Sequence, residues 1–265
     1  MRTTRPLLLL VALSFTVFLA FAQQSRSTTP SVSDPQAVAY LQQSVSALGN
    51  APLDSTATGS VTITAGSLTT HGTVTILTRG TAETSIQFQM PNLTWSVIYA
   101  NEEANRVDSG VSKSVPLELV ASSRCIYFPQ PYLADLLKNP DVVFKFAGNE
   151  TVDSVSANHI HAQNTFASSP LLRSLAEFNT ADIWLDSASG LPLKIAMIRR
   201  YAGGSAPKIP ISITYSNYQT VSGVRYPFTI KEYVTETLWS TTTIQSVTFN
   251  TGLTDANFPV TGGGN

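Results

Sequence analysis

The sequence has little of what nucleic-acid-binding proteins and most intracellular enzymes contain. Charged residues make up only 12% of its 265 residues, whereas an average globular protein has about a quarter. The formal net charge is −1, and the chain lacks a basic cluster suited to nucleic acid or an anionic membrane surface. Serine and threonine fill the polar positions instead, which is typical of exposed strands in a β-rich, non-cytoplasmic protein. A hydrophobic fraction of 43% is enough to bury a core and excludes wholesale disorder.

Cysteine is almost absent. Cys125 is the only one, which excludes an intramolecular disulfide. It lies in the segment 124–128, an apolar context that does not stabilise a thiolate. We therefore expect a buried, inert thiol rather than a nucleophile.

Motifs that carry chemistry are also lacking. The chain has no hydrolase serine motif, no phosphate-cradling glycine loop and no paired-carboxylate pattern. Glu102 and Glu103 are adjacent, so their side chains diverge, and we interpret residues 101–105 as a solvated acidic loop rather than a catalytic dyad. Asp182 and Asp186 share one face of a predicted strand, which would hold two carboxyl groups close enough for acid/base work. Exposed strand ends commonly carry aspartate, so we predict no catalytic residue.

Histidine is scarce, with three in the chain. His159 and His161 have i, i+2 spacing on a predicted strand and so share a face, which would start a zinc site. No Cys, Asp or Glu stands beside them at ligand spacing, and His71 is far away in sequence. We expect a polar outer face there, with no metal and no cofactor. Arg199 and Arg200 are interpreted as a solvated pair at a strand end rather than an anion site.

The N-terminus predicts a signal peptide. Two arginines within residues 1–5 precede an apolar run over 7–19, and Ala20-Phe-Ala22 matches the small-x-small cleavage pattern. We interpret residues 1–22 as a secretory signal cut before Gln23. An uncleaved membrane anchor is the alternative, although the run is short for a spanning helix of ~20 residues.

The rest of the chain predicts one domain between two flexible ends. Residues 23–33 are a flexible leader, 34–259 the domain and 260–265 a flexible tail. The residue directly after the cleavage site is Gln23 and not cysteine, so we expect no lipidated mature N-terminus. The short charged start, the small-residue cleavage site and the missing disulfides favour a bacterial exported protein, which we place in the periplasm.

A helix opens the domain. Asp34 is suited to cap it, Pro35 takes the first helical position and Gly49 follows its end. Its apolar residues recur at three- and four-residue spacing and form one stripe: Val38, Leu41, Val45 and Leu48.

From Thr58 the chain is dominated by the period-two alternation of strands. The stretch 181–227 shows this best, because the turn 186–190 joins two alternating runs into a hairpin with one apolar face. Two short helices interrupt the strands, over 131–140 and from Pro170, and each carries more leucine than its length needs. The sequence therefore predicts a mainly β fold, an antiparallel meander packed on one side.

Segments in the last third resemble the LolA/LolB-like lipoprotein-carrier superfamily. Residues 182–192 are similar to its vWiD…tGLPlk hairpin, residues 215–227 to the strand pair that follows, and residues 250–259 to its last strand and terminal hook. The resemblance implies a strongly curved antiparallel sheet, an incomplete β-barrel, with an N-terminal helix and short lid helices over its concave mouth. In that superfamily the cavity takes acyl chains of a lipoprotein or another amphiphile.

Such a cavity agrees with the apolar surface the strands predict. A dry sheet face too wide for its own strands needs helices or a ligand to cover it. Burial contributes about 25 cal/mol per Å² of apolar area, so an acyl chain would bind in the micromolar range without a polar anchor. Leu171 and Leu175 would be lid residues. The predicted lining, for which a plain core position is the alternative, is Trp95, Tyr99, Phe144, Phe146, Ile183, Leu185, Ile195, Met197, Ile213, Tyr215 and Phe228.

Two functions follow from these features. The first is a periplasmic binding or carrier protein for lipoprotein acyl chains or other amphiphilic ligands. The second is an envelope interaction or regulatory module of the same fold, with a self-filled core and a protein partner. An enzyme ranks third, because it would need a polar cluster inside the cavity.

Overall fold

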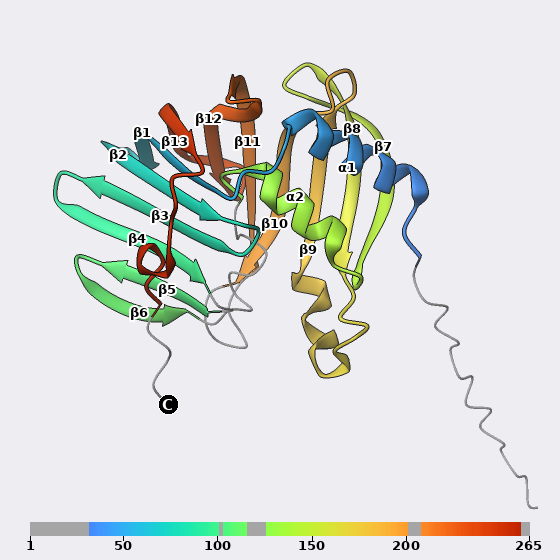
Figure 1. The fold of residues 1–265 in the computed structure, drawn as a ribbon, viewed down its shortest axis with the longest axis horizontal. Helices are drawn as coiled ribbons and strands as arrows, with labels where there is room; N and C mark the ends of the chain where they lie inside the picture. Colours follow the sequence, from blue (N-terminus) through green and yellow to red (C-terminus); the bar gives the residue numbers. More distant parts are fainter. Residues whose placement is uncertain (1–31, 101–102, 116–125, 201–207, 261–265) are drawn as a thin grey trace, which may run out of the picture. The chain divides into compact units, whose positions relative to one another are not determined.

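Within residues 32–100, 103–115, 126–200 and 208–260, which the computed structural model describes, thirteen antiparallel strands form one open sheet (Figure 1). The predicted signal peptide, most of the leader and the tail, and Cys125 lie outside these ranges. The strands are β1 (Asp54–Ala65), β2 (Leu68–Arg79), β3 (Glu83–Met90), β4 (Leu93–Ala100), β5 (Glu103–Asp108), β6 (Val111–Val115), β7 (Val142–Val152), β8 (Val155–Asn164), β9 (Thr180–Asp186), β10 (Pro192–Arg200), β11 (Lys208–Val221), β12 (Val224–Val234) and β13 (Thr237–Phe249).

The strand order is β6-β5-β4-β3-β2-β1-β13-β12-β11-β10-β9-β8-β7. The chain therefore steps outward from β1 to β6, crosses to the opposite edge at β7, and returns strand by strand until β13 pairs with β1. Each step is an antiparallel neighbour pair, as short turns between alternating runs require. The edge strands β6 and β7 do not pair, so the sheet is an incomplete barrel, and the predicted fold class is confirmed.

Helix α1 (Pro35–Leu48) begins and ends where the sequence predicts. The carboxylate of Asp34 accepts a 2.9 Å hydrogen bond from the Gln36 amide, and Pro35 stands at the first helical position. The buried residues are Ala37, Leu41, Ser44 and Leu48, while Val38 and Val45 are partly buried, so the buried stripe is rotated slightly from the predicted one.

The segment before α1 also protects an edge of the sheet. The Asp34 amide donates to the carbonyl of Phe144 (2.8 Å), and the Phe144 amide donates to the hydroxyl of Ser33 (3.1 Å). These bonds occupy backbone groups of the edge strand β7 that would otherwise be open to pairing with another chain.

The end of α1 lies close against the β11–β12 turn. Gly49 has φ 92°, and a Cβ there would collide with the carbonyl oxygen of Gly223. Only glycine can adopt this positive φ and also fit so close to the Gly223 carbonyl without strain.

Two shorter helices follow. Helix α2 (Pro129–Lys138) begins two residues before the predicted Pro131, because Pro129 already supplies the restricted φ of a first helical position. The segment from Pro170 is a 3-10 helix, η3 (Pro170–Phe178), which contacts β8 and β10. Residues 103–105 belong to β5, so the predicted acidic loop is wrong for that part.

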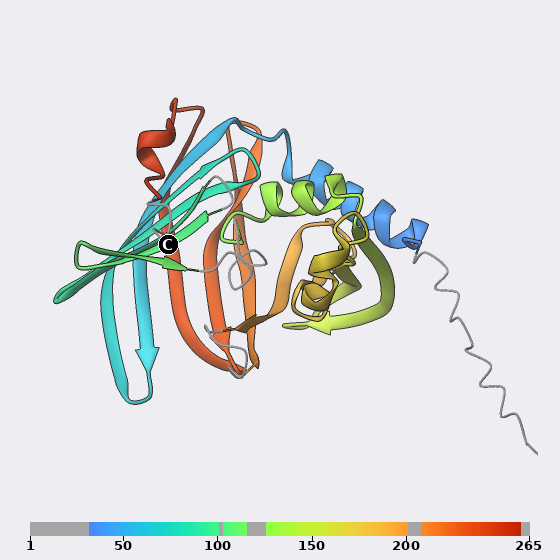
Figure 2. The ribbon, with the colours of Figure 1, turned by 90° about the horizontal axis from the view of Figure 1, so that it is seen from below.

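The sheet curls around α1 and α2, and its concave face forms the main core (Figure 2). Alternate residues of β1–β3 and β7–β13 point inward and meet Leu41 and Leu48 of α1 and Tyr132 and Leu133 of α2 in one continuous apolar cluster. No helix within the described ranges has the length and hydropathy needed to cross a bilayer.

The C-terminal hook covers part of the opposite, convex face. Phe258 is buried against Ile98 and Ala100 of β4, and the guanidinium of Arg79 lies 5.5 Å from its ring. The hook is held at its start by Asp54, whose carboxylate accepts backbone hydrogen bonds from Thr251, Gly252 and Leu253 at 2.7–3.2 Å.

Candidate functional site

The structure places most of the predicted lining residues in the concave core. Trp95 and Phe146 are half-buried against this core, with Trp95 stacked on Phe88 and Phe146 beside Tyr40 of α1. The fully buried members are Phe144, Ile183, Leu185, Ile195, Met197, Ile213, Tyr215 and Phe228.

The remaining predicted residues lie elsewhere. Tyr99 is buried in a separate small cluster with Ala104. Leu175 is half-buried, whereas the side chain of Leu171 is 96% exposed. A role of Leu171 and Leu175 as lid residues therefore stays a prediction, and Leu171 does not contribute to the core.

A buried polar network fastens the start of α2 to the sheet. The hydroxyl of Tyr215 donates to the carbonyl of Ile126 (2.6 Å), and the hydroxyl of Tyr127 donates to Glu232 Oε2 (2.6 Å). Arg199 donates to Glu232 Oε1 at 3.3 Å. We call these five residues the α2 anchor. Arg199 is thus an ion-pair partner with a side chain only 25% exposed, and the prediction of a solvated strand-end residue is wrong for it.

Burial governs the chemistry of the α2 anchor. Desolvation, followed by the nearby charge of Glu232, holds the pKa of Tyr127 well above its usual value. Desolvation does the same to the pKa of Tyr215. Both phenols therefore stay protonated and donate. The carboxylate of Glu232, 8% exposed, has a hydrogen-bond donor in Tyr127 and a cationic partner in Arg199, as a buried acid requires.

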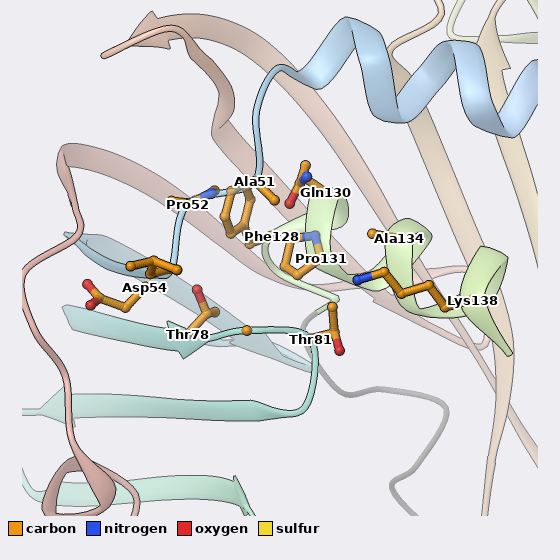
Figure 3. Close-up of a pocket in the computed structure, with 12 residues that line it drawn as sticks. Ala51, Pro52, Asp54, Thr78, Thr81, Phe128, Gln130, Pro131, Ala134 and Lys138 are labelled. Carbon is orange, nitrogen blue, oxygen red and sulfur yellow. The ribbon is translucent and has the colours of Figure 1, made fainter.

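A cavity of about 210 Å³ opens where α2 meets the ends of β1 and β2 (Figure 3). We call it the rim pocket. Its walls are largely apolar and come from the α1–β1 connection, the β2–β3 turn and α2. The lining residues are Ala51, Pro52, Leu53, Asp54, Thr78, Gly80, Thr81, Phe128, Gln130, Pro131, Ala134 and Lys138.

A second cavity of about 190 Å³ lies over β9–β11. Asp182, Lys194 and Glu236 give it a polar wall, and of the predicted lining residues it includes Met197.

The convex face carries a polar cluster, of which the sequence predicted only the two histidines. His159 and His161 share a face, as their spacing predicts, and both contact Asp182 Oδ1, at 2.9 and 3.0 Å. Glu150 lies on the other side of His159 (2.8 Å) and accepts from the Trp184 indole (2.7 Å). The acidic partners come from β7 and β9, so strand pairing rather than sequence spacing brings them together. The described residues hold no group of three ligands arranged for a metal.

The two aspartates considered as an acid/base pair have separate structural roles. Asp182 bonds the histidines, whereas Asp186 accepts hydrogen bonds from the amides of Ala188 and Ser189 in the β9–β10 turn. Desolvation of Asp186 opposes ionisation, but these bonds outweigh it and lower its pKa. The pair is thus not arranged around a shared substrate position.

Comparison of the fold with solved structures gives one consistent answer. A LolA superfamily protein from Nitrosomonas europaea matches with TM-score 0.56 and 12% identity, over 84% of this chain and 97% of that one. The chain has the LolA fold. No protein-family model and no curated protein matches the sequence.

Two further structures have the same fold. An outer membrane lipoprotein-sorting protein domain from Vibrio parahaemolyticus matches with TM-score 0.55 and 13% identity, covering 84% of this chain and 96% of that one. A DUF1329 family protein from Desulfovibrio piger matches with TM-score 0.55 and 12% identity, covering 84% and 97%. The predicted resemblance is confirmed at the level of the LolA fold, which positions α1 and α2 over the concave face.

Proposed function

We propose that the protein is an exported, periplasmic binding or carrier protein for lipoprotein acyl chains or another amphiphile, held on the concave face beneath α2. One observation carries the proposal: the apolar face of an open sheet is covered by helices rather than by a second sheet. Helix α2 can leave that face without breaking any strand pairing.

The energetics suit reversible loading. Moving α2 aside exposes part of the apolar core, and an acyl chain buries that surface again at about 25 cal/mol per Å². The contacts of the acyl chain with the core replace those of α2. The free-energy cost of displacing α2 is therefore set by the few polar bonds of the α2 anchor. A lid held in this way gates entry without unfolding the sheet.

A second function is favoured by how well the core is filled. The rim pocket and the second cavity measure about 210 and 190 Å³, below the 300–1,000 Å³ of ordinary ligand pockets. Most of the side chains proposed to line the cavity belong to one core cluster with residues of α1 and α2. The filled core supports an envelope interaction or regulatory module that binds a protein partner.

Uptake kinetics of a fluorescent long-chain fatty acid separate the two functions. A carrier takes up the probe saturably, and Tyr127→Phe speeds uptake by up to about tenfold, since 1.4 kcal/mol is tenfold in an equilibrium. Tyr233→Phe is the matched control, because Tyr233 is next to Glu232 on β12 but faces the other way. Absence of saturable uptake in the wild type and both variants would favour the module.

A further inference from the structure

His159, on the convex face of β8, lies between two carboxylates. Its Nδ1 is 2.8 Å from Glu150 Oε1 of β7, and its Nε2 is 2.9 Å from Asp182 Oδ1 of β9. The side chain of His159 is only 15% exposed, so water has little room to replace either contact. Both nitrogens of one ring therefore face hydrogen-bond acceptors, which come from different strands.

The number of protons on the ring decides how these two contacts are made. A carboxylate only accepts hydrogen bonds, a neutral imidazole donates through one nitrogen, and an imidazolium donates through both. Hydrogen bonds from Trp184 and then from His159 lower the pKa of Glu150, which therefore stays an ionised acceptor. A neutral His159 would direct a lone pair at one of the two carboxylates, whereas the protonated ring satisfies both.

The neighbouring titratable groups are arranged differently. His161 Nδ1 lies 3.0 Å from the same oxygen of Asp182, and this single contact needs only the one N–H that a neutral ring supplies. Asp186, at the end of β9, accepts hydrogen bonds from two amides of the β9–β10 turn. The geometry therefore singles out His159 as the ring whose hydrogen bonds depend on a second proton.

Two lysines are the cations nearest to this arrangement. Lys194 Nζ of β10 lies 4.7 Å from the centroid of the Trp184 ring, on which His159 stacks at 4.3 Å. Lys145 of β7 is paired with His161 rather than with His159. The charged groups in hydrogen-bond contact with the His159 ring are thus both negative.

We propose that His159 is a proton-dependent clasp on the convex face. The protonated ring adds a side-chain link from β7 to β9 across β8. When the ring loses a proton, as histidines do between about pH 5 and 8, it gives up one of its two carboxylates. The clasp acts on the edge strand β7, where Phe144 holds the segment before α1. This inference goes beyond the proposed function and does not depend on a ligand.

NMR of the imidazole and indole nitrogens between pH 5 and 8 tests the clasp. The chain has three histidines and three tryptophans, so each ring can be followed separately. His159 should carry protons on both nitrogens at the acid end, and the indole N–H signal of Trp184 should move with the same midpoint as His159. A His159 ring with one proton even at pH 5, or an indole signal that does not follow the ring, overturns the proposal.

Two histidine variants assign this response. His159→Phe keeps a ring against Trp184 but removes both nitrogens, so it should abolish the pH response of the indole signal. His71→Gln is the control, because His71 contacts Thr62 at the other end of the chain's strands and should leave the response unchanged. A response that survives in His159→Phe contradicts the assignment to His159.

Glu150→Gln tests the proton count and leaves the histidine in place. The amide oxygen can accept from Trp184 while the amide N–H donates to His159 Nδ1, so the neutral ring is satisfied. His159 should then lose its proton at a pH lower by about half a unit, as a half-exposed ion pair allows. Glu103→Gln, at an exposed position on β5, should not change it. An unchanged titration of His159 in Glu150→Gln overturns the clasp and leaves the proposed carrier function untouched.

Discussion

The hydroxyl of Tyr127 donates a 2.6 Å hydrogen bond to the carboxylate of Glu232, which joins the start of α2 to β12 across 105 positions of sequence. Tyr127→Phe removes this donor from the buried carboxylate, which keeps its 3.3 Å hydrogen bond from Arg199. We expect a loss of about 1–3 kcal/mol in the free energy of unfolding. Urea denaturation measures it, with Tyr233→Phe as the control that should change little.

The lowered pKa of Asp54 predicts that the protein loses stability in acid. Desolvation alone would raise its pKa, but hydrogen bonds from Thr251, Leu253 and Gly252 outweigh this and lower it. An aspartate with a lower pKa in the folded state stabilises the fold above its unfolded pKa of about 3.9, and this stabilisation is lost as the pH falls through the folded pKa.

Asp54→Asn should therefore cost about 1–3 kcal/mol at neutral pH and flatten the fall in stability below about pH 4. Denaturation at a series of pH values measures both effects. Asp153→Asn, in an exposed turn, is the control. If the stability of Asp54→Asn fell below pH 4 as steeply as that of the wild type, the hydrogen bonds between Asp54 and the hook would not contribute to stability.

The polar cluster of Glu150, His159, His161, Asp182 and Trp184 on the convex face should contribute little to stability despite its many hydrogen bonds. Hydrogen bonds from Trp184 and then His159 lower the pKa of Glu150, yet its side chain is 48% exposed. Because solvent screens this exposed group, Glu150→Gln should lower the free energy of unfolding by less than about 1 kcal/mol. The environment of the indole should still change, so tryptophan fluorescence should shift while the denaturation midpoint stays nearly constant. A large loss of stability would mean that the cluster is structural.

Leu171 separates a lid role from a packing role. Its side chain is 96% exposed, so Leu171→Ser should change the free energy of unfolding by less than about 0.5 kcal/mol. If η3 is part of the lid, the same variant should release a bound fatty acid faster. Phe144→Ala, in the buried core, should instead cost about 3–5 kcal/mol. Unchanged release in Leu171→Ser would remove η3 from the lid.

Local pattern was enough to predict most of the fold. Alternation and the turn 186–190 predicted a hairpin with Ile183 and Ile195 on its apolar face, and the structure pairs these two residues directly across β9 and β10. Capping signals located α1 to the residue. These features depend on neighbours in sequence, which is why they can be read from it.

The α2 anchor depends on contacts between distant segments and was missed. Tyr127 lies in a segment without a clear period, so its partner could not be inferred. A signal did exist at Glu232, which continues the inward alternation of Val224, Tyr226, Phe228 and Ile230 on β12. A charge at an inward position indicates a buried partner.

The most direct test of the carrier function is mass spectrometry of an organic extract from the mature protein, purified from the periplasm without detergent. The account predicts a stoichiometric lipid or lipopeptide in that extract. An extract free of lipid, from protein that also takes up no fluorescent fatty acid, would contradict the account and direct the search to a protein partner.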